Sequence, residues 1–264
     1  MPSLWYNVGS KIKEGYSMLN TINKQSDFQF KIPQNLKEKV STRTSKNPTL
    51  KSNGQPKARA SEPLRNKEDV RAIMNYFLNS SQANKYRNYM IFVLGINTRR
   101  RCGDLTNLKV GDVYDPNTDK IYEEVYIREE KTGKSEIIYM NKYCKEAIRL
   151  YLSHKYKDKE YNLDDWLFWS QKPDANGDHK ITVVQIWRIL NNACKALGID
   201  AHVGTHTMRK TGARELYLSN PDDKEALAML QEDLHHSSQN TTLRYIGISE
   251  DKRKELIMNI NWEN

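Results

Sequence analysis

The chain has 264 residues, of which 38% are hydrophobic, and a formal net charge of +9. This length fits one domain with an appendage or two small domains. The longest apolar run, near residues 89–96, is far shorter than the roughly 20 residues of a membrane span. The N-terminus lacks an apolar segment followed by a small-residue cleavage site. We therefore expect a cytoplasmic protein with no membrane partner.

The cysteines and histidines indicate neither a disulfide framework nor a metal site. Cys102, Cys144 and Cys194 are widely separated and have neither paired nor metal-ligand spacing. Of the six histidines, only His235 and His236 are adjacent, and none is expected in a His-x-x-x-His pair on one helix face. We expect reduced thiols, no bound metal and no cofactor.

The positive charge is concentrated at the N-terminus. Residues 1–60 contain eleven Lys or Arg and three Asp or Glu, a net charge of +8, whereas the rest of the chain carries +1. A basic arm favours a polyanion partner, although a solvated tail is the alternative. We interpret residues 1–40 as a short, partly helical basic segment. Residues 41–61, rich in Ser, Thr, Lys, Asn, Pro and Gly, are interpreted as a flexible linker.

The remaining residues, 62–264, carry the patterns of a folded domain. Asn66 is placed to cap a first helix, and a second helix is predicted over residues 82–96. Two strand-like stretches, 121–127 and 135–140, flank Lys131-Thr132-Gly133-Lys134 and predict a hairpin. A further helix is predicted over residues 142–156. The apolar face of the first helix is formed by Val70, Ile73, Met74 and Phe77.

Thr182 and Gln185 form a capping-box pattern, and Gly198 is a natural helix end, so a helix is predicted between them. The residues expected on its buried face are Val183, Ile186, Trp187, Leu190 and Leu197. The residues expected on its opposite, polar face are Gln185, Arg188, Asn192 and Lys195. This stripe fits a solvated face or a contact with phosphates and base edges in a DNA groove. The fold class predicted is mainly α with a small antiparallel β-sheet (α+β).

Four stretches combine residue types that suit phosphate chemistry. They are Thr98 to Leu105, Glu130 to Lys134, His206 to Thr211 and Leu234 to Tyr245. Each stretch alone fits a structural explanation, such as a salt-bridging helix edge, a common hairpin turn or a packing tyrosine. In this order and spacing they resemble the tyrosine recombinase (phage integrase) family. The shared motifs are Arg-x-x-Asp-Leu, a hairpin-turn lysine, His-x-x-Arg, Leu-x-His-Ser-Ser and a tyrosine nine residues after that last histidine. The resemblance covers about residues 62–260.

The resemblance implies a metal-independent enzyme that cleaves and rejoins DNA strands through a 3′-phosphotyrosine intermediate. Tyr245 is the expected nucleophile, because a tyrosine ester keeps the phosphodiester energy for the reverse attack. His206 is expected to assist removal of its proton, since an ordinary tyrosine with a pKa of about 10 is protonated at neutral pH. Lys131 is the expected general acid for the departing 5′-oxygen, with Lys134 as the second choice.

The same resemblance implies that cations stabilise the transferred phosphate. Arg101 and Arg209 are expected to clamp it with their planar forks, and His236 to donate a hydrogen bond to a non-bridging oxygen. Family members commonly have Gly-Leu where this chain has Arg99-Arg100. The side chains that we regard as candidates for DNA contact are Arg99, Arg100, Lys134, Gln185, Arg188, Asn192, Lys195, Lys210 and Arg244.

The resemblance also implies double-stranded DNA as the partner and a homo-oligomer, a dimer or tetramer, on that DNA. A C-terminal helix is predicted over residues 249–260; it docks onto a neighbouring protomer or packs on its own body. Typical members carry a helical core-binding domain where this chain has about 60 basic residues. The main hypothesis is a site-specific recombinase or integrase, with a single-subunit DNA-relaxing enzyme as a close variant. The alternative is a DNA-binding accessory or regulatory protein that keeps the fold with weak or no catalysis.

Overall fold

The structure is a computed structural model that describes residues 60–157 and 159–262. The predictions for the basic segment and for nearly all of the linker lie outside these residues. Every described residue belongs to the unit that spans residues 48–264. No helix in the described ranges combines the length and apolar content that a membrane span requires. The elements are α2 (Lys67–Asn79), α3 (Lys85–Thr98), α4 (Cys102–Thr106), α5 (Val110–Val113), β1 (Tyr114–Asp115), β2 (Lys120–Ile121), β3 (Glu124–Arg128), β4 (Ser135–Tyr139), α6 (Lys142–Tyr156), α7 (Val183–Ala196), α8 (Thr207–Leu218), α9 (Lys224–Asp233), α10 (Gln239–Tyr245) and α11 (Ile248–Met258).

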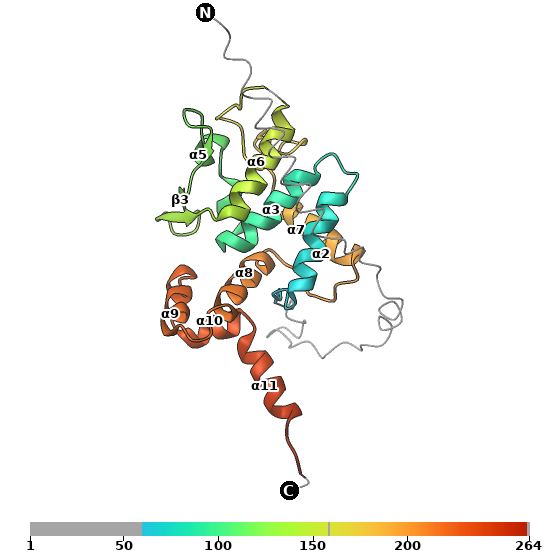
Figure 1. The fold of residues 1–264 in the computed structure, drawn as a ribbon, viewed down its shortest axis with the longest axis vertical. Helices are drawn as coiled ribbons and strands as arrows, with labels where there is room; N and C mark the ends of the chain where they lie inside the picture. Colours follow the sequence, from blue (N-terminus) through green and yellow to red (C-terminus); the bar gives the residue numbers. More distant parts are fainter. Residues whose placement is uncertain (1–59, 158, 263–264) are drawn as a thin grey trace, which may run out of the picture. The chain divides into compact units, whose positions relative to one another are not determined.

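Helix α3 lies in the middle of the main core. Its residues 90–94 are almost completely buried, because the run is apolar on every side and needs neighbours all round. Those neighbours are α2, α6, α7 and α8 (Figure 1). Helix α3 ends at Arg99 in the left-handed conformation, with φ 57°. The chain therefore turns sharply just before Arg101, which is the N-cap of α4.

Strands β3 and β4 form the predicted hairpin. Val125 pairs with Ile138, and Ile127 pairs with Glu136. Val125 and Ile127 are buried while Tyr126 between them is exposed, as expected from the alternation of side chains along a strand. Glu129 follows β3 and continues the buried row. The hairpin thus presents a carboxylate, rather than an apolar side chain, to the interior at its turn.

The mainly helical α+β prediction is confirmed, but the strand boundaries differ. Ile121 does not belong to the hairpin; it pairs with Tyr114, so the described residues contain two two-stranded antiparallel sheets. The turn between β1 and β2 is stabilised by Asp115, whose carboxylate accepts hydrogen bonds from Asn117 N and Thr118 Oγ1. This local turn chemistry is typical of aspartate and was missing from the sequence prediction.

A second, smaller core holds the C-terminal helices. Its buried members are Ala213, Leu230, Leu234 and Ile246. Helix α8 contacts both cores, since Met208 belongs to the main core and Ala213 to the small one. At Gly212 it approaches α3 so closely that a Cβ atom would lie 1.7 Å from the carbonyl oxygen of Ile96. Only glycine allows this backbone-to-backbone packing.

Candidate active site

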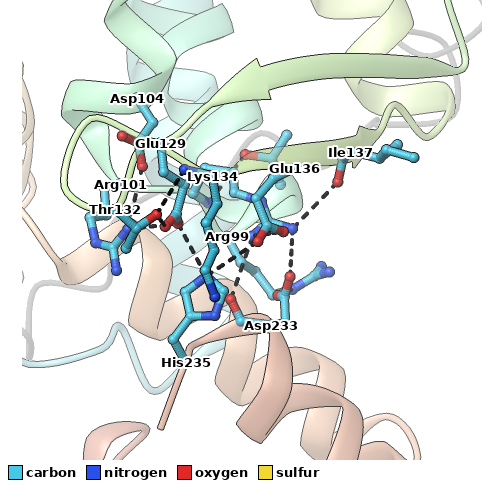
Figure 2. Close-up of polar contacts among 12 residues, drawn as sticks. Arg99, Arg101, Asp104, Glu129, Thr132, Lys134, Glu136, Ile137, Asp233 and His235 are labelled. Atoms are coloured by element: carbon cyan, nitrogen blue, oxygen red, sulfur yellow. Dashed lines mark hydrogen bonds and ion pairs between the residues drawn. The ribbon is translucent and has the colours of Figure 1, made fainter.

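Arg101 is joined to the hairpin turn by two carboxylates. Asp104, one helical turn later, is almost fully buried; its Oδ2 lies 3.6 Å from Arg101 NH1, and its Oδ1 accepts a hydrogen bond from Glu130 N. Arg101 NH1 also donates to Glu129 Oε1 at 2.6 Å (Figure 2). Within the described residues no hydrogen bond occupies Nε or NH2 of Arg101. This edge of the guanidinium is therefore open to an anion.

Arg209 is a buried cation with an unoccupied donor. It is 3% exposed, and its NH2 donates a weak hydrogen bond of 3.4 Å to the backbone oxygen of Asp233. Its NH1 is buried and has no hydrogen-bond partner in the structure. An unsatisfied buried N–H group of a cation is costly. Among the described residues, Arg209 thus keeps a positive charge beside Tyr245 that hydrogen bonds only partly satisfy.

Tyr245 lies at the end of α10 against two histidines and a lysine. Its Oη is 3.3 Å from His206 Nδ1, and its ring meets the His236 ring edge-on at a centroid distance of 4.9 Å. Lys210 Nζ lies 4.8 Å from the centre of the Tyr245 ring. Burial raises the pKa of Tyr245 to about 12, although the charges of Arg209 and Arg101 oppose the rise. The phenol is therefore protonated at neutral pH and needs a base.

Both site histidines are neutral at pH 7. Partial burial, followed by the positive charges of Arg209 and Lys210, lowers the pKa of His206 below its ordinary value of 6.5. Burial and the charge of Arg209 lower the pKa of His236 in the same way. His236 Nδ1 lies 3.0 Å from Thr242 Oγ1, a contact that orients the ring and leaves Nε2 for a ligand. A neutral His206 can accept the Tyr245 proton at Nδ1.

Lys131 is exposed in the hairpin turn and has no side-chain partner among the described residues. The turn is closed by a hydrogen bond from Gly133 N to Glu129 O and by one from Glu129 N to Lys134 O. Gly133 has φ 68°, a conformation that favours glycine. The charge of Lys131 contributes to lowering the pKa of His206. Its ammonium group therefore lies within electrostatic range of His206.

Arg99 and Arg100, predicted as candidates for DNA contact, have internal partners. Arg99 Nε donates to Asp233 Oδ2 at 3.0 Å, and Arg100 NH2 donates to Asp233 Oδ1 at 2.6 Å. Arg100 is only 6% exposed, and its NH1 lies 3.6 Å from Glu136 Oε2. These two arginines connect the end of α9 to the end of α3 and the hairpin. Their ion pairs within the chain account for both positive charges without a contact to DNA.

The polar stripe of α7 is partly as predicted. Arg188, Asn192 and Lys195 are exposed. Gln185 instead completes the capping box: its Oε1 accepts from Thr182 N, and its Nε2 donates to Ser170 Oγ. Trp187, expected on the buried face, is 38% exposed, and its Nε1 donates to Val203 O. The indole needs an acceptor for its N–H group, and this backbone oxygen holds it at the helix edge.

The other predicted residues lie at different distances from Tyr245. Lys210 lies against the Tyr245 ring, and its Nζ also donates to the backbone oxygen of Ser61 at 2.7 Å. Lys134 and Arg244 are exposed, and Arg244 Nε donates to Asn240 O within its own helix. The structure thus brings Arg101, Arg209, His206, His236 and Tyr245 together, with Lys131 at the edge of the group.

Sequence reasoning missed two carboxylates. Glu129 was readable in principle, because Val125, Ile127 and Glu129 follow the two-residue period of an inward-facing row. Asp233 gave no such signal, since its arginine partners are far away in the sequence. Within residues 60–157 and 159–262, no three His, Cys, Asp or Glu side chains gather in a group that could hold a metal ion. The functional groups of the candidate site include a phenol, a neutral imidazole that can accept a proton, an ammonium group and two guanidinium groups.

Comparisons with known proteins identify a family match over most of the chain. Residues 65–252 match the phage integrase family. The chain is 34% identical over 193 residues to the probable integrase/recombinase YoeC of Bacillus subtilis (strain 168), which covers 72% of this chain and 91% of that protein. It is 27% identical to a tyrosine recombinase of Agathobacter rectalis, over 69% of this chain and 54% of that protein.

Two solved structures share the fold. The crystal structure of XerA recombinase superposes with a TM-score of 0.53 at 23% identity, over 77% of this chain and 68% of that one. The XerH site-specific recombinase, bound to a palindromic difH substrate in a post-cleavage complex, gives a TM-score of 0.55 at 20% identity, over 78% and 54%. The extent of the family match and the identity to YoeC decide the assignment: this chain belongs to the phage integrase family of tyrosine recombinases.

Proposed function

We propose that this chain cleaves and rejoins DNA strands through a covalent bond between Tyr245 Oη and a 3′-phosphate. The observation that carries the proposal is the meeting of three groups. Tyr245 Oη lies 3.3 Å from a neutral imidazole nitrogen of His206, next to Arg209, whose buried NH1 lacks an acceptor. A nucleophile with its base, beside a cation prepared for an oxyanion, is the arrangement that phosphoryl transfer requires.

The cleavage step follows from these positions. Tyr245 Oη attacks the phosphorus while its proton passes to His206 Nδ1. The bond from phosphorus to the 5′-oxygen breaks, and that oxygen takes a proton from Lys131. Arg101 and Arg209 balance the charge on the non-bridging oxygens, and His236 donates a hydrogen bond from Nε2. Rejoining is the reverse: a 5′-hydroxyl attacks the phosphotyrosine and Tyr245 leaves, so no metal, cofactor or external energy source is consumed.

Double-stranded DNA is the proposed partner. The exposed Arg188, Asn192 and Lys195 offer two cations and an amide along one face of α7, a combination that suits phosphates and base edges. The XerH site-specific recombinase, which shares the fold, is bound to a palindromic difH substrate. The basic residues 1–60 would add a salt-dependent contact with phosphates. Deletion of this segment should therefore weaken DNA binding and flatten its dependence on salt.

We propose further that a second copy of the chain covers the end of α11. The start of this helix is attached to its own body, because Arg65 and Arg214 both pair with Asp251. The end of α11 and the residues that follow it are apolar, and the other described residues leave them exposed. The exposed fractions are 60% for Leu256, 59% for Ile257, 73% for Met258, 55% for Ile260 and 89% for Trp262. Leu256→Asp with Ile257→Asp should reduce oligomers on DNA in sedimentation experiments while leaving single-site binding intact.

A nicked suicide substrate, from which the short cut strand diffuses away, tests the enzymatic proposal. Wild type should accumulate a protein–DNA adduct that resists denaturing electrophoresis, and Tyr245→Phe should bind the same DNA without forming one. A wild type that binds DNA but never forms an adduct would leave the accessory, DNA-binding role as the better description. Paired sites then distinguish exchange of strands between partners from relaxation of one duplex.

A further inference from the structure

Glu129 contacts three separate parts of the candidate active site. Its side chain is fully buried at the base of the hairpin turn. Oε1 accepts the 2.6 Å hydrogen bond from Arg101 NH1, and Oε2 accepts one of 2.8 Å from Thr132 Oγ1. His235 Nε2, in the loop that leads to His236, lies 3.3 Å from Oε1. Figure 2 shows these side chains around the carboxylate.

The first contact fixes the direction of the Arg101 fork. A guanidinium on a flexible side chain can rotate, and only one orientation presents two parallel N–H groups to a phosphate. Glu129 Oε1 binds NH1 from the buried side, and Asp104 Oδ2 lies 3.6 Å from the same nitrogen. Both carboxylates thus act on one nitrogen. The other edge, Nε and NH2, has no hydrogen-bond partner among the described residues and is left for a ligand.

The second contact fixes the turn that carries Lys131. Thr132 follows Lys131 directly, and its hydroxyl bonds to Glu129. The backbone of Glu129 closes the same turn through Gly133 N and Lys134 O. Side chain and backbone of one residue therefore both restrain the path of the turn. Lys131 itself stays exposed, so its stem can move while its Cα is held.

The carboxylate is suited to this double role. Burial raises the pKa of Glu129, but the hydrogen bond from Thr132 and the charges of Arg101 and His235 outweigh burial and hold it below its ordinary value. The group is therefore ionised at neutral pH. Both oxygens of a carboxylate accept, whereas a glutamine of the same size has one acceptor and one donor. With its Oε1 toward Arg101, a glutamine would have to reverse the hydrogen bond with Thr132, and it carries no negative charge to hold the guanidinium.

We propose that Glu129 is a positioning residue that holds Arg101 and the Lys131 turn in a fixed relation, so that the cation on the phosphate and the acid at the 5′-oxygen act on the same bond. This inference rests on the proposed function. Glu130, which follows Glu129, supplies a matched control because it carries the same charge in the same turn but its side chain is exposed. Glu130→Gln removes one negative charge near the DNA without breaking either contact of Glu129.

The test is the single-turnover rate of adduct formation at saturating DNA, measured on two suicide substrates. One has the natural 5′-oxygen at the scissile position; the other has sulfur there, a leaving group that departs as a thiolate without protonation. Glu129→Gln should lower the rate on the oxygen substrate about 100-fold, the size expected for misplaced catalytic groups. On the sulfur substrate the loss should shrink to about tenfold, the part due to Arg101. Glu130→Gln should stay within about twofold of wild type on both.

Thr132→Val separates the two contacts and serves if Glu129→Gln folds poorly. It removes the hydroxyl but leaves the Arg101–Glu129 pair, so its loss on the oxygen substrate should vanish on sulfur. A Glu129→Gln rate within about twofold of wild type on oxygen would overturn the inference. Equal losses on both substrates, for Glu129→Gln and Thr132→Val alike, would also overturn it. Neither result affects the proposed function, which fails only if wild type forms no adduct.

Discussion

The two halves of the candidate active site rest on cores of very different size. Arg101 and the Lys131 turn are attached to the main core around α3 and the hairpin, which contains most of the buried apolar side chains. His236 and Tyr245 are attached to the cluster of Ala213, Leu230, Leu234 and Ile246. Stabilisation by burial grows with apolar area, and weakly packed segments open first. We therefore expect the half with Arg101 and Lys131 to be the more rigid, and the half with His236 and Tyr245 to be the more easily displaced.

Helix α8 and Asp233 connect the halves. Helix α8 carries Arg209, has His206 at its N-cap, and has side chains in both cores. Asp233, at the end of α9, pairs with Arg99 and Arg100 beside the hairpin. The position of Tyr245 therefore depends on this shared helix and on charged contacts between the halves, of which the Asp233 cluster is one. Substitutions that weaken one half of the site, or the connection between the halves, should therefore have different effects.

The largest effect is expected at the connection itself, from Arg209→Ala. Loss of this guanidinium removes a donor directed at the phosphate and should slow adduct formation about 10³-fold in single-turnover cleavage. Arg209→Lys keeps the charge but loses the planar fork, so it should recover only part of the rate. Full activity of the lysine variant would show that charge alone, and not fork geometry, is needed.

Leu230→Ala compared with Leu152→Ala tests the difference between the cores. Both leucines are fully buried, and each truncation should cost about 2–5 kcal/mol. In Leu230→Ala, hydrogen exchange should accelerate in α9 and α10 while α3 remains protected, and adduct formation should fall more than DNA binding. In Leu152→Ala the loss should appear in global thermal unfolding. If both variants lose protection in the same segments, the two cores unfold as one.

The pH dependence of cleavage tests whether His206, at the N-cap of the connecting helix α8, acts as the base. His206 must be neutral to take the Tyr245 proton, and its pKa lies below 6.5. The rate should therefore be level near pH 7 and fall as the pH drops through that lowered pKa, about tenfold for each further unit. His206→Gln should be slower and lack this acid limb. A midpoint above pH 6.5 in wild type would contradict the assignment.

The smallest effect is expected from Lys210→Met, which acts only on the nucleophile side. The ammonium lies 4.8 Å from the centre of the Tyr245 ring, and an interaction of this kind contributes about 0.5–1 kcal/mol. Adduct formation should slow by roughly two- to fivefold. Lys210→Arg should retain most of the rate, because arginine also places a cation over the ring. An equal loss in both variants would indicate that the contact with Ser61 O is the one that matters.

The parts of the fold that sequence predicts well are those decided locally. The helix over 142–156 and the capping box at Thr182 follow from residues within a few positions of each other, and both are present. The hairpin follows from alternation and from Gly133. The proposed catalytic group could be predicted because its side chains carry recognisable chemistry in a fixed order, and the structure brings Tyr245 and His206 together as expected.

The remainder depends on partners that are distant in sequence. Arg99 and Arg100 look like surface cations until Asp233 is placed beside them, more than 130 positions later. Trp187 fits the apolar period of α7, but its N–H group finds an acceptor only at the helix edge. Such pairings are decided by tertiary packing, which local patterns do not record.

The contact between Gly212 and the Ile96 carbonyl has a consequence for how this protein can diverge. Because it joins backbone to backbone, the separation between the helix that carries Arg209 and the turn that leads to Arg101 does not depend on any side-chain rotamer. Exposed positions such as Arg188 or Lys195, which we propose as DNA contacts, can therefore vary without altering that separation. A single added methyl at position 212 would alter it. Under the proposed function, the residues that could change the DNA target and the backbone atoms that fix the catalytic geometry are therefore different parts of the same chain.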